Sequence, residues 1–156
     1  MGSQADFPPR GVGFAGLGAM GFSMASNLLA AGISVTGFDL NPDILSKLTA
    51  LGGKAASTIR DASLGQDKFF IMVATPEQVD SVVFGPQKLT ETLPQGAIVC
   101  LFSTLPPNYV LELPARLALQ GRSDIQLVDC PVSGGAIGAK NGSLTVSKAF
   151  IRTGSV

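Results

Sequence analysis

A glycine-rich turn, Gly16-Leu17-Gly18-Ala19-Met20-Gly21, stands between a short apolar run and a segment with helical periodicity. The apolar run covers residues 12–15, and large apolar side chains recur at helical spacing over residues 20–29. Glycines at these three positions permit a tight turn, close approach of the backbone to a ligand, and close packing of the helix on the strand. The motif therefore predicts a strand, a tight turn and a helix in succession.

Short apolar runs and helical patterns alternate along the rest of the chain. Strands are predicted over residues 33–38, 69–74, 97–101 and 125–128, and helices are predicted after Asn41-Pro42-Asp43, after Thr75-Pro76-Glu77 and over residues 108–119. Near-continuous apolar strands are typical of a parallel sheet that is covered on both faces. The pattern predicts an α/β fold with a doubly wound parallel sheet of the Rossmann type.

A carboxylate, Asp39, ends the second predicted strand, about 20 residues beyond the glycine turn. Free backbone N–H groups and the positive end of the first helix would bind a diphosphate, and Asp39 would accept hydrogen bonds from ribose hydroxyls. This carboxylate would repel a 2′-phosphate, and the next residues, Leu40 and Asn41, supply no Arg to bind one. We therefore expect a dinucleotide site that favours NAD over NADP. The alternative is a plain glycine turn with Asp39 as a helix cap.

Composition and charge bear on the partners, the location and the metal sites that the chain could have. The chain has 156 residues, enough for one domain, and its eleven basic residues balance eleven acidic ones, which argues against nucleic-acid or membrane partners. The apolar runs are too short to span a bilayer and the start does not resemble a signal peptide, so a cytoplasmic location is expected. The chain has no His, and Cys100 and Cys130 lie in apolar runs, so no metal site is expected.

Two motifs in the right order resemble the β-hydroxyacid dehydrogenases, which include 3-hydroxyisobutyrate, L-threonate and 6-phosphogluconate dehydrogenases. The first motif is residues 13–21, and the second is residues 129–139 followed by residues 141–146. The resemblance covers residues 11–146 and implies the NAD(P)-binding Rossmann domain of that family. It also implies an oxidoreductase that transfers hydride between NAD and a small hydroxyacid.

The motif and the resemblance together assign candidate site residues. The expected cofactor contacts are Gly16, Leu17, Gly18, Ala19, Met20, Gly21, Asp39, Asn41, Thr75 and Thr104. Ser133, Gly134 and Gly135 match the substrate loop of the family, and Ser133 is the expected catalytic residue. The alternatives are a plain turn at residues 133–135, a helix cap at Thr104, and a double role as cap and cofactor contact at Thr75.

The end of the chain departs from the family pattern. Relatives carry a catalytic Lys on a long helix and then an all-helical domain that makes their homo-oligomers, whereas Lys140 and Lys148 match no such position and the chain stops at Val156. We expect residues 1–10 to be a flexible leader and residues 147–156 a divergent tail, with the C-terminal helical domain of the family absent and turnover negligible. Two alternatives stay open: a stand-alone, non-catalytic NAD(P)-binding or regulatory module, and a fragment that does not fold stably by itself.

Overall fold

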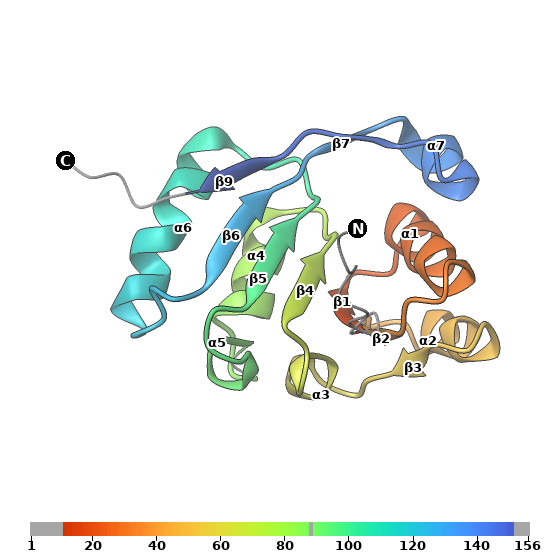
Figure 1. The fold of residues 1–156 in the computed structure, drawn as a ribbon, viewed down its shortest axis with the longest axis horizontal. Coiled ribbons are helices and arrows are strands. Elements are labelled where there is room, and N and C mark those ends of the chain that lie inside the picture. The colour runs from red at the N-terminus through yellow and green to blue at the C-terminus, as the bar shows by residue number, and fades with distance from the viewer. Residues whose placement is uncertain (1–10, 88, 152–156) are drawn as a thin grey trace, which may run out of the picture.

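The computed structural model describes residues 11–87 and 89–151 (Figure 1), so the predicted leader and the last five residues of the predicted tail lie outside the described residues. The main sheet contains β1 (Val12–Ala15), β2 (Val35–Phe38), β3 (Lys54–Ala55), β4 (Lys68–Ile71), β5 (Ile98–Leu101), β6 (Gln126–Asp129) and β9 (Ala149–Ile151). The helices are α1 (Ala19–Ala30), α2 (Pro42–Ala50), α3 (Ile59–Ser63), α4 (Pro76–Val83), α5 (Leu89–Thr92), α6 (Pro107–Leu119) and α7 (Gly135–Asn141).

The strand order is β3-β2-β1-β4-β5-β6-β9. The first six strands are parallel, and β9 pairs antiparallel with β6. This order confirms the doubly wound parallel sheet, in which the direction of winding reverses between β1 and β4. Ligands of such sheets bind at the carboxyl ends of the strands where that reversal occurs.

Clusters of buried side chains cover both faces of the sheet. Consecutive residues of a strand point to opposite faces, and Phe14 accordingly packs with α1 and α2 while Ala15 packs in the larger cluster with α3, α4, α5 and α6. Both residues are fully buried. The central strand β1 is therefore held from both sides, which fixes the turn that follows it.

The fourth strand is shorter than the sequence predicts. It ends at Ile71 rather than at residue 74, because the Val73 backbone N–H donates to the Ser103 hydroxyl (3.0 Å) instead of to a neighbouring strand. The chain thus leaves the sheet after β4, and Val73 and Ala74 are free to line the space beyond the strand ends.

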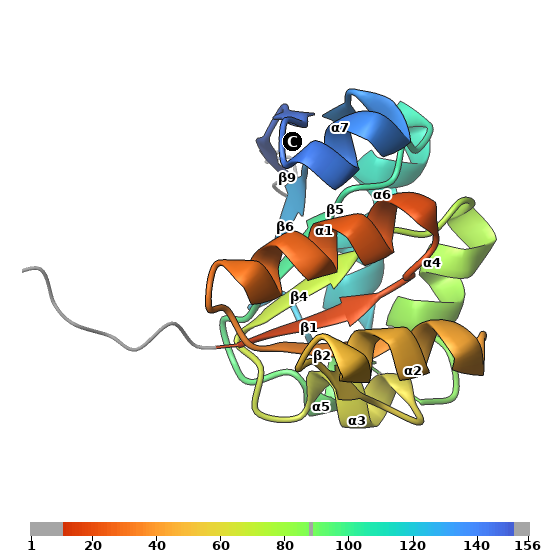
Figure 2. The ribbon, with the colours of Figure 1, turned by 90° about the vertical axis from the view of Figure 1, so that its right-hand side faces the viewer.

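The segment after β6 packs away from the sheet centre. A short ribbon of β7 (Val132–Ser133) and β8 (Thr145–Val146) leads into and out of α7, which lies against α1 (Figure 2). The Asn27 side-chain amide donates to the Ala139 carbonyl (2.6 Å) and joins the two helices. Residues 149–151, which belong to the predicted divergent tail, form β9 on the edge of the sheet.

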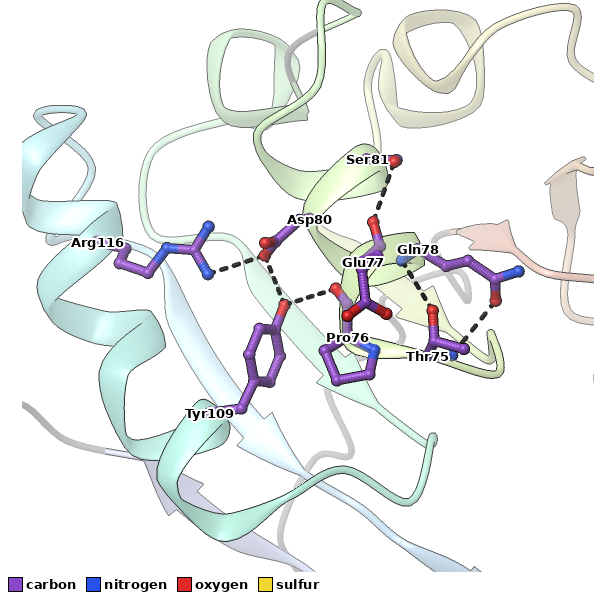
Figure 3. Close-up of polar contacts among 8 residues, drawn as sticks. All are labelled: Thr75, Pro76, Glu77, Gln78, Asp80, Ser81, Tyr109 and Arg116. Carbon is purple, nitrogen blue, oxygen red and sulfur yellow. Dashed lines mark hydrogen bonds and ion pairs between the residues drawn. The ribbon is translucent and has the colours of Figure 1, made fainter.

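Helices α4 and α6 are joined by a polar cluster (Figure 3). Asp80 Oδ1 accepts hydrogen bonds from the Tyr109 hydroxyl (2.7 Å) and from Arg116 Nη1 (2.8 Å), and the Arg116 guanidinium also lies over the Phe84 ring. Burial alone would raise the pKa of Asp80, but the hydrogen bonds from Arg116 and Tyr109 lower it below its usual value. The cluster therefore stabilises the ionised carboxylate and holds α4 against α6.

We expect Asp80→Asn to lower the free energy of unfolding at neutral pH by about 1 kcal/mol, a modest figure because the ion pair is partly exposed. The pKa of Asp80 in the folded chain lies below its value of about 3.9 in the unfolded chain. The ionised carboxylate therefore stabilises the fold in full above about pH 3.9, and this stabilisation is lost as the pH falls through the folded pKa. Urea unfolding of the wild-type and Asp80→Asn chains between pH 7 and pH 2.5 measures the difference between their free energies of unfolding. A wild-type advantage that does not shrink below about pH 4 would contradict the assignment.

Candidate functional site

A cleft of about 620 Å³ opens at the carboxyl ends of β1, β2 and β4, beside the point where the sheet reverses. Its walls include Gly16, Gly18, Met20 and Gly21 from the glycine turn, Phe38, Asp39 and Leu40 from the end of β2, Val73 and Ala74 from the end of β4, and Gln78, Ser81 and Val82 from α4. The predicted glycine turn and the predicted acid thus face the same cavity.

Two of the three motif glycines are required by the fold itself. Gly16 has a φ of +91°, and a Cβ on it would lie 2.2 Å from the Met72 carbonyl oxygen. A Cβ on Gly21 would lie 1.9 Å from the Gly16 carbonyl oxygen. Neither position has room for a side chain, so these glycines explain the tight turn and the close contact between α1 and β1.

Gly18 is different, because nothing in the described protein requires it. Its φ of −65° and ψ of −166° suit any residue, and a Cβ on it would meet no atom within 4 Å. The space beside Gly18 belongs to the cleft. Glycine at this position leaves the backbone open to close approach by a ligand, which is the role that a dinucleotide site requires.

The first turn of α1 offers unpaired backbone donors. Asn41, Thr58 and Thr75 cap α2, α3 and α4 with their side chains. The N-cap of α1 is Gly18, which has no side chain to cap the helix, and the first turn of α1 contains no acid. The first N–H groups of a helix carry the positive end of its dipole. The start of α1, beside the cleft, is therefore suited to an anionic group such as a diphosphate.

Asp39 is tied to the glycine turn through both of its oxygens. Oδ2 accepts from the Leu17 backbone N–H (2.7 Å) and Oδ1 accepts from the Asn41 backbone N–H (2.8 Å). Each carboxylate oxygen retains a further lone pair for a hydroxyl donor in the cleft. The alternative role for Asp39, a helix cap, belongs instead to Asn41, whose side chain accepts from the Asp43 backbone N–H (3.0 Å).

Thr75 does act as a helix cap, and it reveals a cleft residue that the sequence analysis missed. Its hydroxyl accepts from the Gln78 backbone N–H (3.3 Å), and Gln78 Oε1 accepts from the backbone N–H groups of Ala74 (2.7 Å) and Thr75 (3.3 Å). Thr75 itself is not part of the cleft wall, whereas Gln78 is. The spacing of Thr75 and Gln78 is that of a capping box, so a sequence signal for this pair existed.

The other predicted contacts lie outside this cleft. Leu17 is buried, and Ala19 and Asn41 flank the cleft without lining it. Thr104 is exposed after β5 and does not cap a helix, because α6 begins at Pro107 with Pro106 before it. Ser133 pairs with Thr145 in the β7–β8 ribbon. Gly134, with a φ of +127°, is the N-cap of α7, and Gly135, with a φ of +61°, is its first residue. The roles expected of Thr104 and of residues 133–135 stay predictions.

The two cysteine thiols, one on β5 and one directly after β6, are shielded from solvent. Burial raises the pKa of the Cys100 thiol to about 12 and also raises the pKa of Cys130, so both thiols stay protonated and unreactive at neutral pH. Within residues 11–87 and 89–151, no group of three or more His, Cys, Asp or Glu side chains could hold a metal ion. In the same part of the chain, no helix has the length and apolar character needed to cross a membrane.

Comparison with known proteins places this site in a family. Residues 11–149 match the family described as the NAD binding domain of 6-phosphogluconate dehydrogenase. The chain is 35% identical over 137 residues to an L-threonate dehydrogenase from Cupriavidus necator, an alignment that covers 88% of this chain and 45% of that protein.

Solved structures agree with this assignment. A 3-hydroxyisobutyrate dehydrogenase from Salmonella typhimurium is 34% identical, with a TM-score of 0.80 over 89% of this chain and 47% of that one. The protein Psf3, solved in complex with NADP+ and 2-OPP, is 30% identical, with a TM-score of 0.81 over 89% of this chain and 48% of that one.

The present chain spans slightly less than half the length of these relatives. Within that span it carries the strand order, the glycine turn and the acid of a dinucleotide site. The chain belongs to the β-hydroxyacid dehydrogenase family and represents its N-terminal NAD(P)-binding domain.

Proposed function

We propose that this domain binds NAD in preference to NADP and serves an oxidoreductase that acts on a small hydroxyacid. The observation that carries the proposal is Gly18, whose missing side chain has no structural reason other than room for a ligand in the cleft. A cytoplasmic location and assembly into homo-oligomers, expected from the sequence and the resemblance, belong to the same proposal.

Residues of the described chain account for each part of the cofactor site. The backbone N–H groups at the start of α1 would hold the diphosphate, and Asp39, fixed by Leu17 and Asn41, would orient a ribose through its hydroxyls. The bound nicotinamide would supply the carbon that accepts or gives a hydride. On the substrate side, Ser133, Gly134 and Gly135 would hold the hydroxyacid through hydroxyl and backbone N–H donors.

The preference for NAD rests on the fixed carboxylate of Asp39. A 2′-phosphate beside this group would meet a negative charge, and the exposed Leu40 that follows it offers no cation in return. The NADP+ complex of Psf3 shows that a relative of similar fold takes the other cofactor, so the choice depends on local residues and not on the fold. Asp39 is the local residue whose charge would distinguish NAD from NADP.

We expect Asp39→Asn to weaken NADH binding about ten-fold while leaving NADPH binding equal or tighter, because a charge-assisted hydrogen bond to ribose is lost and a repulsion is removed. Fluorescence titration of NADH and NADPH against both chains measures the ratio of the two dissociation constants. Asp43→Asn is the matched control, since it removes the same charge from the nearby first turn of α2, outside the cleft. Tighter binding of NADPH than of NADH by the wild-type chain would reject the proposed preference.

A further inference from the structure

Helix α7 buries little apolar surface where it packs on α1. The two helices lie side by side, away from the centre of the sheet (Figure 1, Figure 2). The buried residues of α7 are Gly138 and Ala139, and its one large apolar side chain, Ile137, is 77% exposed. Small residues allow the helices to approach closely, but the apolar area that they remove from water is small. Apolar packing alone therefore holds α7 in place only weakly.

A side chain of α1 supplies the polar contact between the two helices. Asn27 Nδ2 donates to the Ala139 carbonyl (2.6 Å), which also accepts from the Gly142 backbone N–H (3.3 Å). A carbonyl can only accept, so the atom of Asn27 that faces it must be the nitrogen, and the orientation of the amide is fixed. Among the described residues, no other side chain forms a hydrogen bond with α7.

The position of α7 determines the position of the expected substrate loop. Gly134 is the N-cap of α7 and Gly135 is its first residue, and the Gly134 carbonyl accepts from the Gly138 backbone N–H (3.0 Å). Ser133 directly precedes them in β7. The other partner, α1, begins in the cofactor cleft. A displacement of α7 along α1 would therefore move residues 133–135 relative to that cleft.

We propose that Asn27 is a positioning residue for the substrate loop, whose amide fixes α7 on α1 and thereby places residues 133–135 relative to the bound cofactor. This inference rests on the proposed function, in which residues 133–135 hold the hydroxyacid. Asn27 does not line the cleft, so it acts through α7 and not by touching the cofactor. Loss of its hydrogen bond affects the substrate side of the site and leaves the glycine turn intact.

Two substitutions in the 156-residue chain remove the donor in different ways. Asn27→Ala removes the amide, and because Ala is a better helix former than Asn, α1 should stay folded. Asn27→Asp keeps the shape of the side chain but turns a carboxylate oxygen toward the Ala139 carbonyl and the negative end of the α7 dipole. Ser26→Ala is the matched control, since the Ser26 hydroxyl donates to the Phe22 carbonyl (2.8 Å) within α1.

NMR titration of the ¹⁵N-labelled chain measures both ligands on one sample, first NAD and then 3-hydroxyisobutyrate or L-threonate at saturating NAD. The backbone N–H signal of Gly18 reports on the cofactor, and the signals of Gly134 and Gly135 report on the hydroxyacid. We expect Asn27→Ala to bind the hydroxyacid about three- to ten-fold more weakly, and Asn27→Asp at least as weakly, as the loss of one hydrogen bond implies. The dissociation constant for NAD should not change, and Ser26→Ala should bind both ligands as the wild type does.

The outcomes separate this inference from the proposed function. Wild-type affinity for the hydroxyacid in both Asn27 variants would overturn the inference and leave the proposed function standing. An equal loss of NAD and hydroxyacid binding would also overturn it, because Asn27 would then act on α1 as a whole. A wild-type chain that binds NAD, but whose Gly134 and Gly135 signals respond to neither hydroxyacid, would reject the substrate role of residues 133–135 and this inference with it.

Discussion

A chain with Gly18→Ala is expected to remain folded and to bind NADH at least about a hundred-fold more weakly than the wild-type chain. The added methyl group would meet no protein atom within 4 Å, so the fold has no reason to resist it. It would, however, stand where the diphosphate must approach the backbone. Loss of one or two hydrogen bonds to a charged group corresponds to roughly 3 kcal/mol, which is about a hundred-fold in affinity.

Stability and binding must be measured on the same sample for this variant. The free energy of unfolding should change by no more than a few tenths of a kcal/mol. Ala restricts the unfolded chain more than Gly does, which stabilises the fold, but Ala is a poorer helix N-cap than Gly, which offsets that gain. Calorimetric titration with NADH then reports the affinity. Full NADH affinity in a stably folded Gly18→Ala chain would mean that the open space beside Gly18 serves no ligand.

Gly21→Ala is expected to show the opposite pattern, a loss of about 2 kcal/mol of folding stability. Its Cβ would overlap the Gly16 carbonyl oxygen, 1.9 Å away, and this oxygen belongs to backbone that cannot rotate aside. Ala gains about 1 kcal/mol over Gly in a helix interior, but overpacking against backbone costs typically 1–3 kcal/mol and sometimes more. Only a shift of α1 away from β1 would relieve the overlap, so the turn and its ligand contacts should be disturbed as well.

Urea unfolding of the Gly21→Ala and Gly18→Ala chains, measured in parallel, compares their folding stabilities. The two variants add the same methyl group to the same motif, three residues apart, so composition and unfolded-state effects largely cancel. We expect a lower urea midpoint for Gly21→Ala only. Equal midpoints would show that the close contact between Gly21 and Gly16 does not constrain the fold.

Local chemistry explains why the glycine turn and Asp39 could be predicted from sequence. Gly16 needs a positive φ, Gly21 needs contact with the preceding turn, and Asp39 stands at the end of the next strand, so all three are set within one βαβ unit. The parallel sheet could also be predicted locally, because strands and helices alternate with short connections and the strands are strongly apolar. The strand order places Gly16, Gly21 and Asp39 beside the point between β1 and β4 where the direction of winding reverses.

Tertiary contacts explain what the sequence did not reveal. Gln78 lines the cleft because the fold places α4 and the glycine turn around the same cavity, and the capping box gives no hint of that arrangement. The contact of Asn27 with Ala139 spans 112 positions and fixes α7 on α1 without any local pattern. Strand β9 has only three residues, and its pairing with β6 depends on an available sheet edge rather than on its own periodicity.

A thermal melt of the 156-residue chain with and without NADH tests the central claim, that the cleft beside Gly18 binds a dinucleotide. At NADH about 100 times above its dissociation constant, binding to the native state alone adds about 2.7 kcal/mol, which corresponds to a rise of roughly 5–10 °C for a domain of this size. We expect one cooperative transition whose midpoint rises by that amount. A cooperative transition that NADH leaves unmoved, or a chain that melts without cooperativity, would contradict it.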